Sequence, residues 1–252
     1  MAVATDRAQQ YQQDGVLFPI DLFSEDEIAG YRREFDRLDQ TEGVDRPQER
    51  NRQRHFDLEF VWRMAAHPTL ISLMQELMGP DLLLLATDFF VKYGSPEAKA
   101  FVAWHQDVTY WGLEPPDAHT AWIAVDDSNV DNGCMRVIPG SHRHGIVTHG
   151  TSQRAGNQLS INQEIPDELV DSSSAVDLEL RAGQISIHDG HLYHASQPNR
   201  SQRRRCGMTV RFVRPNVRQS TENSLGAEWR PILVGGEDRY GNFTLAERPF
   251  PV

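Results

Sequence analysis

The sequence predicts an α+β protein in which N-terminal helices buttress one face of a β-sandwich or barrel. Helical periodicity is concentrated in the first third of the chain, and short runs rich in β-branched and aromatic residues, separated by turn signals, follow it. The length of 252 residues fits one domain, because all-β barrels often reach this size as a single unit. No domain boundary is visible, so we expect a single domain over residues 1–252.

Two helices are expected in the first third. Ser24 and Glu27 have the spacing of a capping box, so a helix should begin here. The apolar residues that follow at helical spacing are Ile28, Tyr31, Phe35 and Leu38. A second helix is expected after Pro68, which suits a first turn, and Gly79 and Pro80 should end it. Its apolar side holds Leu70, Ile71, Met74, Leu77 and Met78.

The rest of the chain is dominated by strand-like runs. They cover residues 82–93, 101–108, 120–125, 135–138, 176–180, 184–188 and 206–213. Turn signals between them are Asp131-Asn-Gly133, Pro139-Gly140 and Ala182-Gly183. Along the last run, Cys206, Met208, Val210 and Phe212 alternate with Arg205, Gly207, Thr209 and Arg211. The apolar set should pack against the helices, and the second set should then line the interior.

Two stretches show no periodicity: residues 41–54, which are charged, and residues 143–174, which are long and polar. A loop as long as the second one inside a compact domain is usually a lid, a binding loop or a disordered segment. We expect residues 143–174 to form a lid that is poorly ordered until substrate contacts fix it.

Composition excludes several classes of partner. A formal net charge of −11 argues against a nucleic-acid partner, which would require a basic surface. The longest apolar run, residues 82–86, is far too short to cross a bilayer, and no secretory signal is visible. The two cysteines, Cys134 and Cys206, leave no room for a disulfide framework and are most simply buried apolar residues. We therefore expect a cytoplasmic protein without a membrane partner.

The motif with the clearest chemistry is Trp104-His-Gln-Asp107. In a strand, residues i and i+2 point to the same face, so His105 and Asp107 can reach one metal ion. One imidazole and one carboxylate, completed by a second, distant imidazole, form the facial triad that is typical of non-haem iron(II) oxygenases. Such a triad leaves three coordination positions open, enough for a bidentate 2-oxo acid and for dioxygen.

The His-x-acid spacing is weak as a signal, since chance alone predicts about 1.4 such pairs in a chain of this composition. The second pair present is His55-Phe-Asp57, outside the strand series. We interpret His55 as a surface or helix-entry histidine. Three downstream histidines, His188, His191 and His194, could each supply the distant imidazole, and the residues alone do not separate them.

Several longer motifs resemble the phytanoyl-CoA dioxygenase family of iron/2-oxoglutarate oxygenases. In chain order they are Asp14-Gly-Val-Leu-Phe-Pro-Ile20, Trp104-His-Gln-Asp107, Ala121-Trp-Ile-Ala-Val-Asp-Asp127, Asn132-Gly-Cys-Met-Arg-Val-Ile-Pro-Gly-Ser-His142 and His194-Ala-Ser-Gln-Pro-Asn199 with its trailing arginines. They span roughly residues 14 to 213, and the resemblance implies a double-stranded β-helix, the jelly-roll or cupin-like barrel. It also implies iron(II), 2-oxoglutarate and dioxygen as cofactor and co-substrates.

The resemblance assigns roles to particular residues. It makes His194 the distal iron ligand beside His105 and Asp107. Arg205, eleven residues after His194, matches the arginine that binds the far carboxylate of 2-oxoglutarate, for which a planar guanidinium is well suited. Trp122 matches, more loosely, an aromatic residue near the co-substrate.

Other residues near these motifs have simpler interpretations. Arg203 and Arg204 are expected to be solvated or to back the carboxylate site, and Arg211 is a minor rival to Arg205. The histidines around the polar loop, His142, His144 and His149, are not expected to bind metal. Tyr110 and Trp111 either line the substrate pocket or belong to the core.

We therefore expect an iron(II)/2-oxoglutarate-dependent dioxygenase that hydroxylates an unactivated C–H bond of a small molecule and releases succinate and CO2. Desaturation, epoxidation and cyclisation are alternative outcomes of the same chemistry. Halogenation is disfavoured because Asp107 is present where halogenating relatives have Gly or Ala. A non-catalytic cupin-like binding protein is the remaining alternative.

Overall fold

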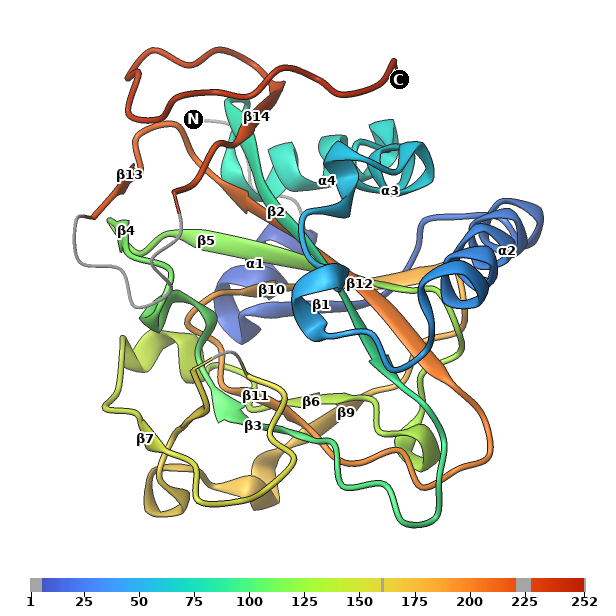
Figure 1. Cartoon of the computed structure of the whole chain (residues 1–252). Coiled ribbons are helices and arrows are strands. Elements are labelled where there is room, and N and C mark those ends of the chain that lie inside the picture. The colour runs from blue at the N-terminus through green and yellow to red at the C-terminus, as the bar shows by residue number, and fades with distance from the viewer. Residues whose placement is uncertain (1–5, 160, 221–227, 252) are drawn as a thin grey trace.

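The computed structural model describes residues 6–159, 161–220 and 228–251. Two facing antiparallel sheets form its centre, and helices cover the outer face of the larger one (Figure 1). The helices are α1 (Asp6–Asp14), α2 (Glu25–Glu42), α3 (Glu59–Ala65) and α4 (Pro68–Met78). In the part of the chain described, no helix is both long and apolar enough to span a membrane.

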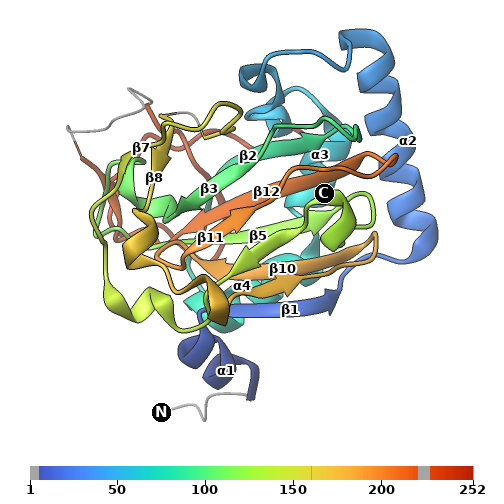
Figure 2. The same cartoon turned by 90° about the horizontal axis from the view of Figure 1, so that it is seen from below.

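The larger sheet has six strands among the described residues, all paired antiparallel. In spatial order they are β1 (Val16–Asp21), β10 (Gln184–Asp189), β5 (Ala118–Ala124), β12 (Arg205–Val213), β2 (Leu82–Lys92) and β14 (Ile232–Gly235). The smaller sheet consists of β3 (Val102–His105), β11 (His194–Ser196), β6 (Met135–Val137) and β9 (Val176–Leu178). Viewed from below, β3 and β11 cross in front of the strands of the larger sheet (Figure 2).

Two short strand pairs extend the two-sheet core. They are β4 (Leu113–Glu114) with β13 (Arg218–Gln219), and β7 (Gly150–Thr151) with β8 (Gln163–Glu164). Short 3-10 turns cover Gln48–Asn51, Arg54–Phe56, Asp107–Thr109, Val130–Asn132, Ser141–His144, Asp167–Leu169 and Ser172–Ser174. The first lies in the charged stretch 41–54, the second begins at the end of that stretch, and both contact β2.

Side chains alternate along β12 as the sequence predicts. One set packs against the helices, and the other set faces the space between the two sheets. The outward set of β12, which includes Met208 and Phe212, is fully buried in one cluster with α2, α3 and α4, where Phe35, Trp62 and Met74 are also fully buried. Burial of apolar area on this scale is what fixes the helices to the sheet. The expected α+β layering, with helices on one face of a β-sandwich, is confirmed.

Both expected helices begin where the sequence indicates, and the second also ends there. α2 has the capping box, with Ser24 accepting from the Glu27 amide and Glu27 accepting from the Ser24 amide. α4 has Pro68 in its first turn and is capped at Gly79. The sequence analysis missed α1, α3, β1, β11 and β14, and also the two-residue strands β4, β7, β8 and β13. α1 buries a single residue, Tyr11, and β11 is three residues long, so neither carries a periodic signal.

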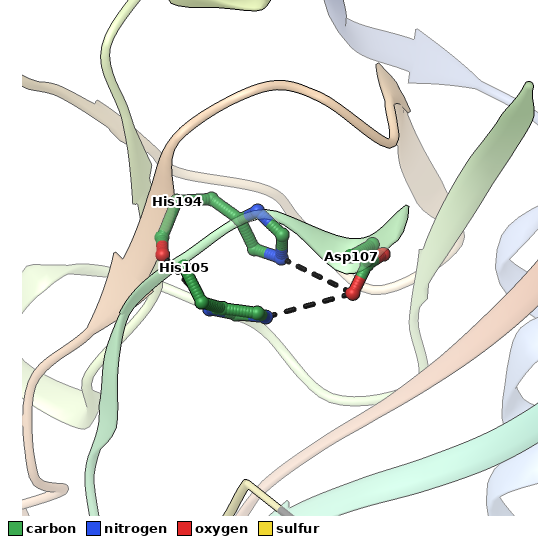
Figure 3. A group of neighbouring side chains, drawn as sticks. All are labelled: His105, Asp107 and His194. Carbon is green, nitrogen blue, oxygen red and sulfur yellow. Dashed lines mark hydrogen bonds and ion pairs between the residues drawn. The ribbon is translucent and has the colours of Figure 1, made fainter. Parts of the chain in front are cut away.

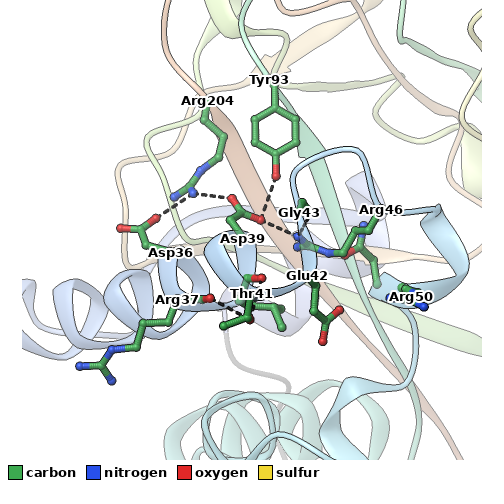
Figure 4. Close-up of polar contacts among 12 residues, drawn as sticks. Asp36, Arg37, Asp39, Thr41, Glu42, Gly43, Arg46, Arg50, Tyr93 and Arg204 are labelled. Carbon is green, nitrogen blue, oxygen red and sulfur yellow. Dashed lines mark hydrogen bonds and ion pairs between the residues drawn. The ribbon is translucent and has the colours of Figure 1, made fainter.

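Arg204 connects the outer end of β12 to α2 (Figure 4). Its guanidinium donates to Asp126 at 2.8 and 3.1 Å, to Asp36 at 2.8 Å and to Asp39 at 3.0 Å. Asp39 also accepts from Arg46. The expectation that Arg204 is solvated or backs the carboxylate site is wrong, because its side chain points outward into this cluster of carboxylates. Arg203 is exposed, as expected.

Replacing Arg204 should destabilise the fold. Arg204→Ala leaves Asp36, Asp39 and Asp126 close together without their shared counter-charge, so the free energy of unfolding should fall by about 1–3 kcal/mol. Urea unfolding followed by circular dichroism measures this change. Arg203→Ala is the matched control and should change the free energy by less than about 0.5 kcal/mol; equal losses in both variants would contradict a structural role specific to Arg204.

Candidate active site

His105, Asp107 and His194 converge in the space between the two sheets (Figure 3). One potential ligand atom from each lies within 4.8 Å of the others. The Nε2 atoms of His105 and His194 lie 3.5 and 3.8 Å from Asp107 Oδ1. The two histidines are direct partners across the β3–β11 pairing, which is why residues 89 positions apart meet here.

Asp107 reaches this group by a route that the sequence did not predict. The expected strand over residues 101–108 ends at His105, and Asp107 begins a 3-10 turn. Gln106 is still extended, so His105 and Asp107 face the same side although the strand has ended. Thr120 Oγ1 donates to Asp107 Oδ2 at 3.1 Å, and the Tyr110 hydroxyl lies 3.5 Å from Oδ1. These contacts orient the carboxylate.

Hydrogen bonds to backbone carbonyls orient both imidazoles. His105 Nδ1 lies 2.9 Å from the Ala103 carbonyl oxygen, and His194 Nδ1 lies 3.0 Å from that of Leu192. A carbonyl only accepts, so Nδ1 carries the proton and the Nε2 lone pair faces Asp107. This outer hydrogen bond is the usual partner of a metal-ligating histidine.

The protonation states of the group suit metal binding. Burial by itself would raise the pKa of Asp107, but the neighbouring imidazoles of His105, His188 and His194, followed by the charge of Arg211, hold it well below its usual range. Burial, reinforced by the charge of His105, lowers the pKa of His194 well below the ordinary value. A carboxylate and neutral imidazoles are the forms that coordinate a divalent ion. The residues present therefore fit a mononuclear metal centre.

The structure separates the three histidines that the sequence left open. His191 is half-buried, pairs with Asp189 at 3.0 Å and does not line the central cavity. His188 is buried beside the group, with Nε2 3.5 Å from Asp107 Oδ2 and its ring centre 4.8 Å from that of His194. Of the described residues, those whose donor atoms form a compact set of three are His105, Asp107 and His194.

Arg205 enters the same cavity from β12. The cavity has a volume of about 50 Å³ and is lined by both His105 and Arg205. The Arg205 side chain is buried, and burial lowers its pKa to about 10. Among the described residues no carboxylate forms an ion pair with it, and its Nε has no hydrogen-bond partner. A buried, uncompensated guanidinium is costly unless an anion binds to it, so this cavity fits the carboxylate of an acidic co-substrate.

Trp122 forms a wall of this cavity beside Arg205. The guanidinium carbon lies 5.4 Å from the centre of a Trp122 ring, within the range of a cation–π contact. Gly207 provides room for the indole, since a Cβ at that position would overlap the Trp122 ring.

Lys92 is a cavity neighbour that the sequence analysis missed. Its Nζ donates to Ser196 Oγ at 2.6 Å and to the Gln197 carbonyl at 2.5 Å. Burial, and then the charge of Arg205, lowers the pKa of Lys92 to about 5. The available signal was a lysine at the end of a largely apolar strand run, where this side chain, which is rarely buried, is unusual.

Of the remaining residues named from the sequence, some line a cavity and others bond to the backbone away from it. Arg211 also lines the cavity but is paired with Asp88, so it differs from Arg205 in being compensated. Tyr110 lines this cavity and a second one, and Trp111 lines the second. His142 and His149 bond to backbone groups, and neither they nor His144 belong to a metal-binding group of described residues.

Two further expectations can be compared with the structure. His55 does stand at a helix entry, but it is fully buried, so the surface interpretation is wrong. Its Nδ1 lies 2.9 Å from Thr87 Oγ1, and burial lowers its pKa to about 4. Cys134 and Cys206 are free and buried, as expected.

The two facing sheets and the two-histidine, one-carboxylate group between them define a jelly-roll protein with a site of the mononuclear non-haem iron type. A sequence profile described as phytanoyl-CoA dioxygenase (PhyH) matches residues 11–207. The chain belongs to the phytanoyl-CoA dioxygenase family. It is a non-haem iron(II), 2-oxoglutarate-dependent dioxygenase, and the resemblance inferred from its motifs is confirmed.

Individual relatives differ in how much of the chain they match. A phytanoyl-CoA dioxygenase domain-containing protein 1 homolog of Dictyostelium discoideum is 36% identical over 110 residues, which are 43% of this chain and 39% of that protein. An ectoine dioxygenase of Bordetella bronchiseptica is 25% identical over 247 residues, 89% of this chain and 78% of that protein. The apo structure of the non-haem monooxygenase ThoJ superposes with a TM-score of 0.75 at 29% identity, covering 94% of this chain and 86% of that one.

Proposed function

We propose that this enzyme hydroxylates an unactivated C–H bond of a small molecule, with iron(II) held by His105, Asp107 and His194. The observation that supports this most strongly is that one cavity is lined by a compact three-donor group and by a buried guanidinium without a counter-charge. Iron(II), 2-oxoglutarate and dioxygen together would supply the oxidant, with succinate and CO2 as by-products.

The protein's own contribution is to bind, orient and exclude water. The carbonyls of Ala103 and Leu192 hold the two imidazoles with Nε2 toward Asp107. Arg205 would bind the far carboxylate of 2-oxoglutarate through parallel charge-assisted hydrogen bonds, against the wall formed by Trp122. Thr120 keeps the Asp107 carboxylate in place. Positioning of this kind is how a rigid site favours one C–H bond over others.

The same residues also bear on the alternatives to hydroxylation. Asp107 occupies the position that a halide would need, which disfavours halogenation. A non-catalytic binding protein would have no need of an intact donor group next to an unpaired Arg205. Desaturation, epoxidation and cyclisation use the same oxidant and are distinguished by product analysis. The Bordetella relative is named for a small molecule, ectoine, which supports a small substrate here. The cytoplasmic location stays a prediction.

The metal assignment predicts the behaviour of single variants. Under anaerobic conditions iron(II) and 2-oxoglutarate should give a visible charge-transfer band, and His105→Ala, Asp107→Ala and His194→Ala should each abolish or strongly weaken it. His191→Ala, outside the cavity, is the control and should leave the band unchanged. If His194→Ala preserves iron binding while His188→Ala or His191→Ala destroys it, the distal ligand is assigned wrongly.

The co-substrate assignment predicts a selective effect of one arginine. Arg205→Ala removes a buried, charge-assisted pair, so 2-oxoglutarate binding should weaken by about 2–5 kcal/mol. Anaerobic calorimetry on the iron-loaded protein measures this loss. Arg203→Ala and Arg204→Ala should weaken binding far less, since neither side chain enters the cavity. Equal losses in the three variants would mean that the cluster acts as a diffuse positive patch.

Residues 143–174 remain a predicted lid. The segment carries more buried apolar material than expected: Leu159 and Ile165 are buried, and the Ile165 amide donates to the Trp104 carbonyl at 2.7 Å. Leu159 lines both cavities. Hydrogen exchange with iron and 2-oxoglutarate should show weak protection over residues 143–174, which rises when substrate is added. Strong protection before substrate arrives would show that the segment is fixed structure.

A further inference from the structure

His188 is a buried side chain beside the metal centre to which the proposed function assigns no role. It belongs to β10, is 1% exposed and lines the same cavity as the donor group. Neither of its ring nitrogens has a hydrogen-bond partner in the described part of the chain. Both histidines of the donor group differ in this respect, because Nδ1 of each lies within hydrogen-bond distance of a backbone carbonyl.

An imidazole of this kind is not explained by packing. A buried polar atom that loses its contact with water and finds no partner destabilises the folded state. A phenyl ring has nearly the same shape and would fill this position without that cost. Buried unsatisfied groups are uncommon in native proteins and are often found where a site performs chemistry. The position of His188 is therefore better explained by an interaction at the metal centre.

Strand pairing directs His188 toward Asp107. His188 and Thr120 are direct partners across β10 and β5, so their side chains are neighbours on one face of the larger sheet. Thr120 Oγ1 donates to Asp107 Oδ2 at 3.1 Å, and His188 Nε2 lies 3.5 Å from the same oxygen. The imidazoles of His105 and His194 instead lie nearest to Oδ1.

The two oxygens of Asp107 thus have different neighbours. Oδ1 faces the other two members of the donor group, and His188 is outside the compact set of three donors. Oδ2 faces Thr120 and His188. A carboxylate can bind a metal ion through one oxygen or through both. Hydrogen-bond donors at Oδ2 favour binding through Oδ1 alone, because they compete with the metal for the lone pairs of Oδ2.

We infer that His188 is a positioning residue that keeps Asp107 a one-oxygen ligand. Its Nε2–H donates to Oδ2 beside the Thr120 hydroxyl, which requires an approach of a few tenths of an ångström from the distance observed. A carboxylate oxygen only accepts, so Nε2 carries the proton in this arrangement. With Oδ2 held in this way, two coordination positions stay available for 2-oxoglutarate. The inference rests on the proposed function and adds a residue to it.

His188→Phe separates this role from that of a ligand. Without the donor, Asp107 can also bind through Oδ2 and then competes with the co-substrate for a coordination position. Iron(II) affinity should stay within about threefold of wild type, whereas 2-oxoglutarate affinity of the iron-loaded protein should fall about tenfold or more, as is typical when an outer partner of a metal ligand is removed. Anaerobic calorimetry with iron(II) and then with 2-oxoglutarate measures both constants. The charge-transfer band should weaken at a fixed, subsaturating 2-oxoglutarate concentration.

Two further variants serve as rescue and control. His188→Gln keeps a side-chain N–H at about the reach of Nε2, so it should restore most of the 2-oxoglutarate affinity. His191→Phe makes the same substitution outside the cavity and should change neither constant. The metal-free melting temperature of His188→Phe should equal or exceed that of wild type, because the substitution removes two unsatisfied nitrogens.

Several results would overturn the inference. Unchanged 2-oxoglutarate affinity in His188→Phe would show that the imidazole has no such role. A loss of iron affinity as large as in His105→Ala would make His188 a ligand. Equal losses of both affinities with a lower melting temperature would make it a structural residue, and failure of His188→Gln to restore binding would exclude the N–H donor. If wild type gives no charge-transfer band, the proposed function fails instead, so the two failures are distinguishable.

Discussion

The antiparallel pairing of β11 with β3 is the contact on which the site depends. It sets His194 directly opposite His105, and the His194 carbonyl also lies 3.1 Å from His105 Nδ1. One ladder therefore positions both imidazoles and fixes the orientation of one ring. Asp107 follows two residues after His105, where the chain turns, and Thr120 of β5 in the facing sheet donates a hydrogen bond to its carboxylate.

β12 links this centre to the stability of the whole fold. Its outward side chains, such as Met208 and Phe212, are buried among the helices, and its inward ones include Arg205 and Arg211. Hydrophobic burial on one face thus supports two guanidinium groups on the other, where each loses the solvation of water. Arg204, at the same strand end, points outward to Asp126 and α2. The three arginines thus lie in different environments: Arg204 in a cluster of carboxylates, Arg211 beside Asp88, and Arg205 in the cavity without a carboxylate partner among the described residues.

The cavity lined by His105 and Arg205 differs from the second cavity, lined by Trp111, in the elements that form its walls. Paired strands form much of the first cavity and hold Trp122, His194 and Arg205. Irregular segments form much of the second cavity, including Gln53 before α3 and Gln158 in the polar segment 143–174. Walls made of paired strands suit chemistry that must be the same in every turnover, and irregular walls are where recognition of particular molecules is usually placed.

The sequence by itself determined the layering, the β12 alternation and the family, and it supplied the candidate residues of the metal site. Each follows from local periodicity or from a motif of fixed spacing, such as Trp104-His-Gln-Asp107. Tertiary structure decided what depends on contacts between distant segments. It placed His188 beside the donor group and His191 outside it, although the two are three residues apart. It also buried Lys92 and His55 and directed Arg204 away from the cavity, because strand pairing and side-chain direction, rather than composition, determine which neighbour a polar residue meets.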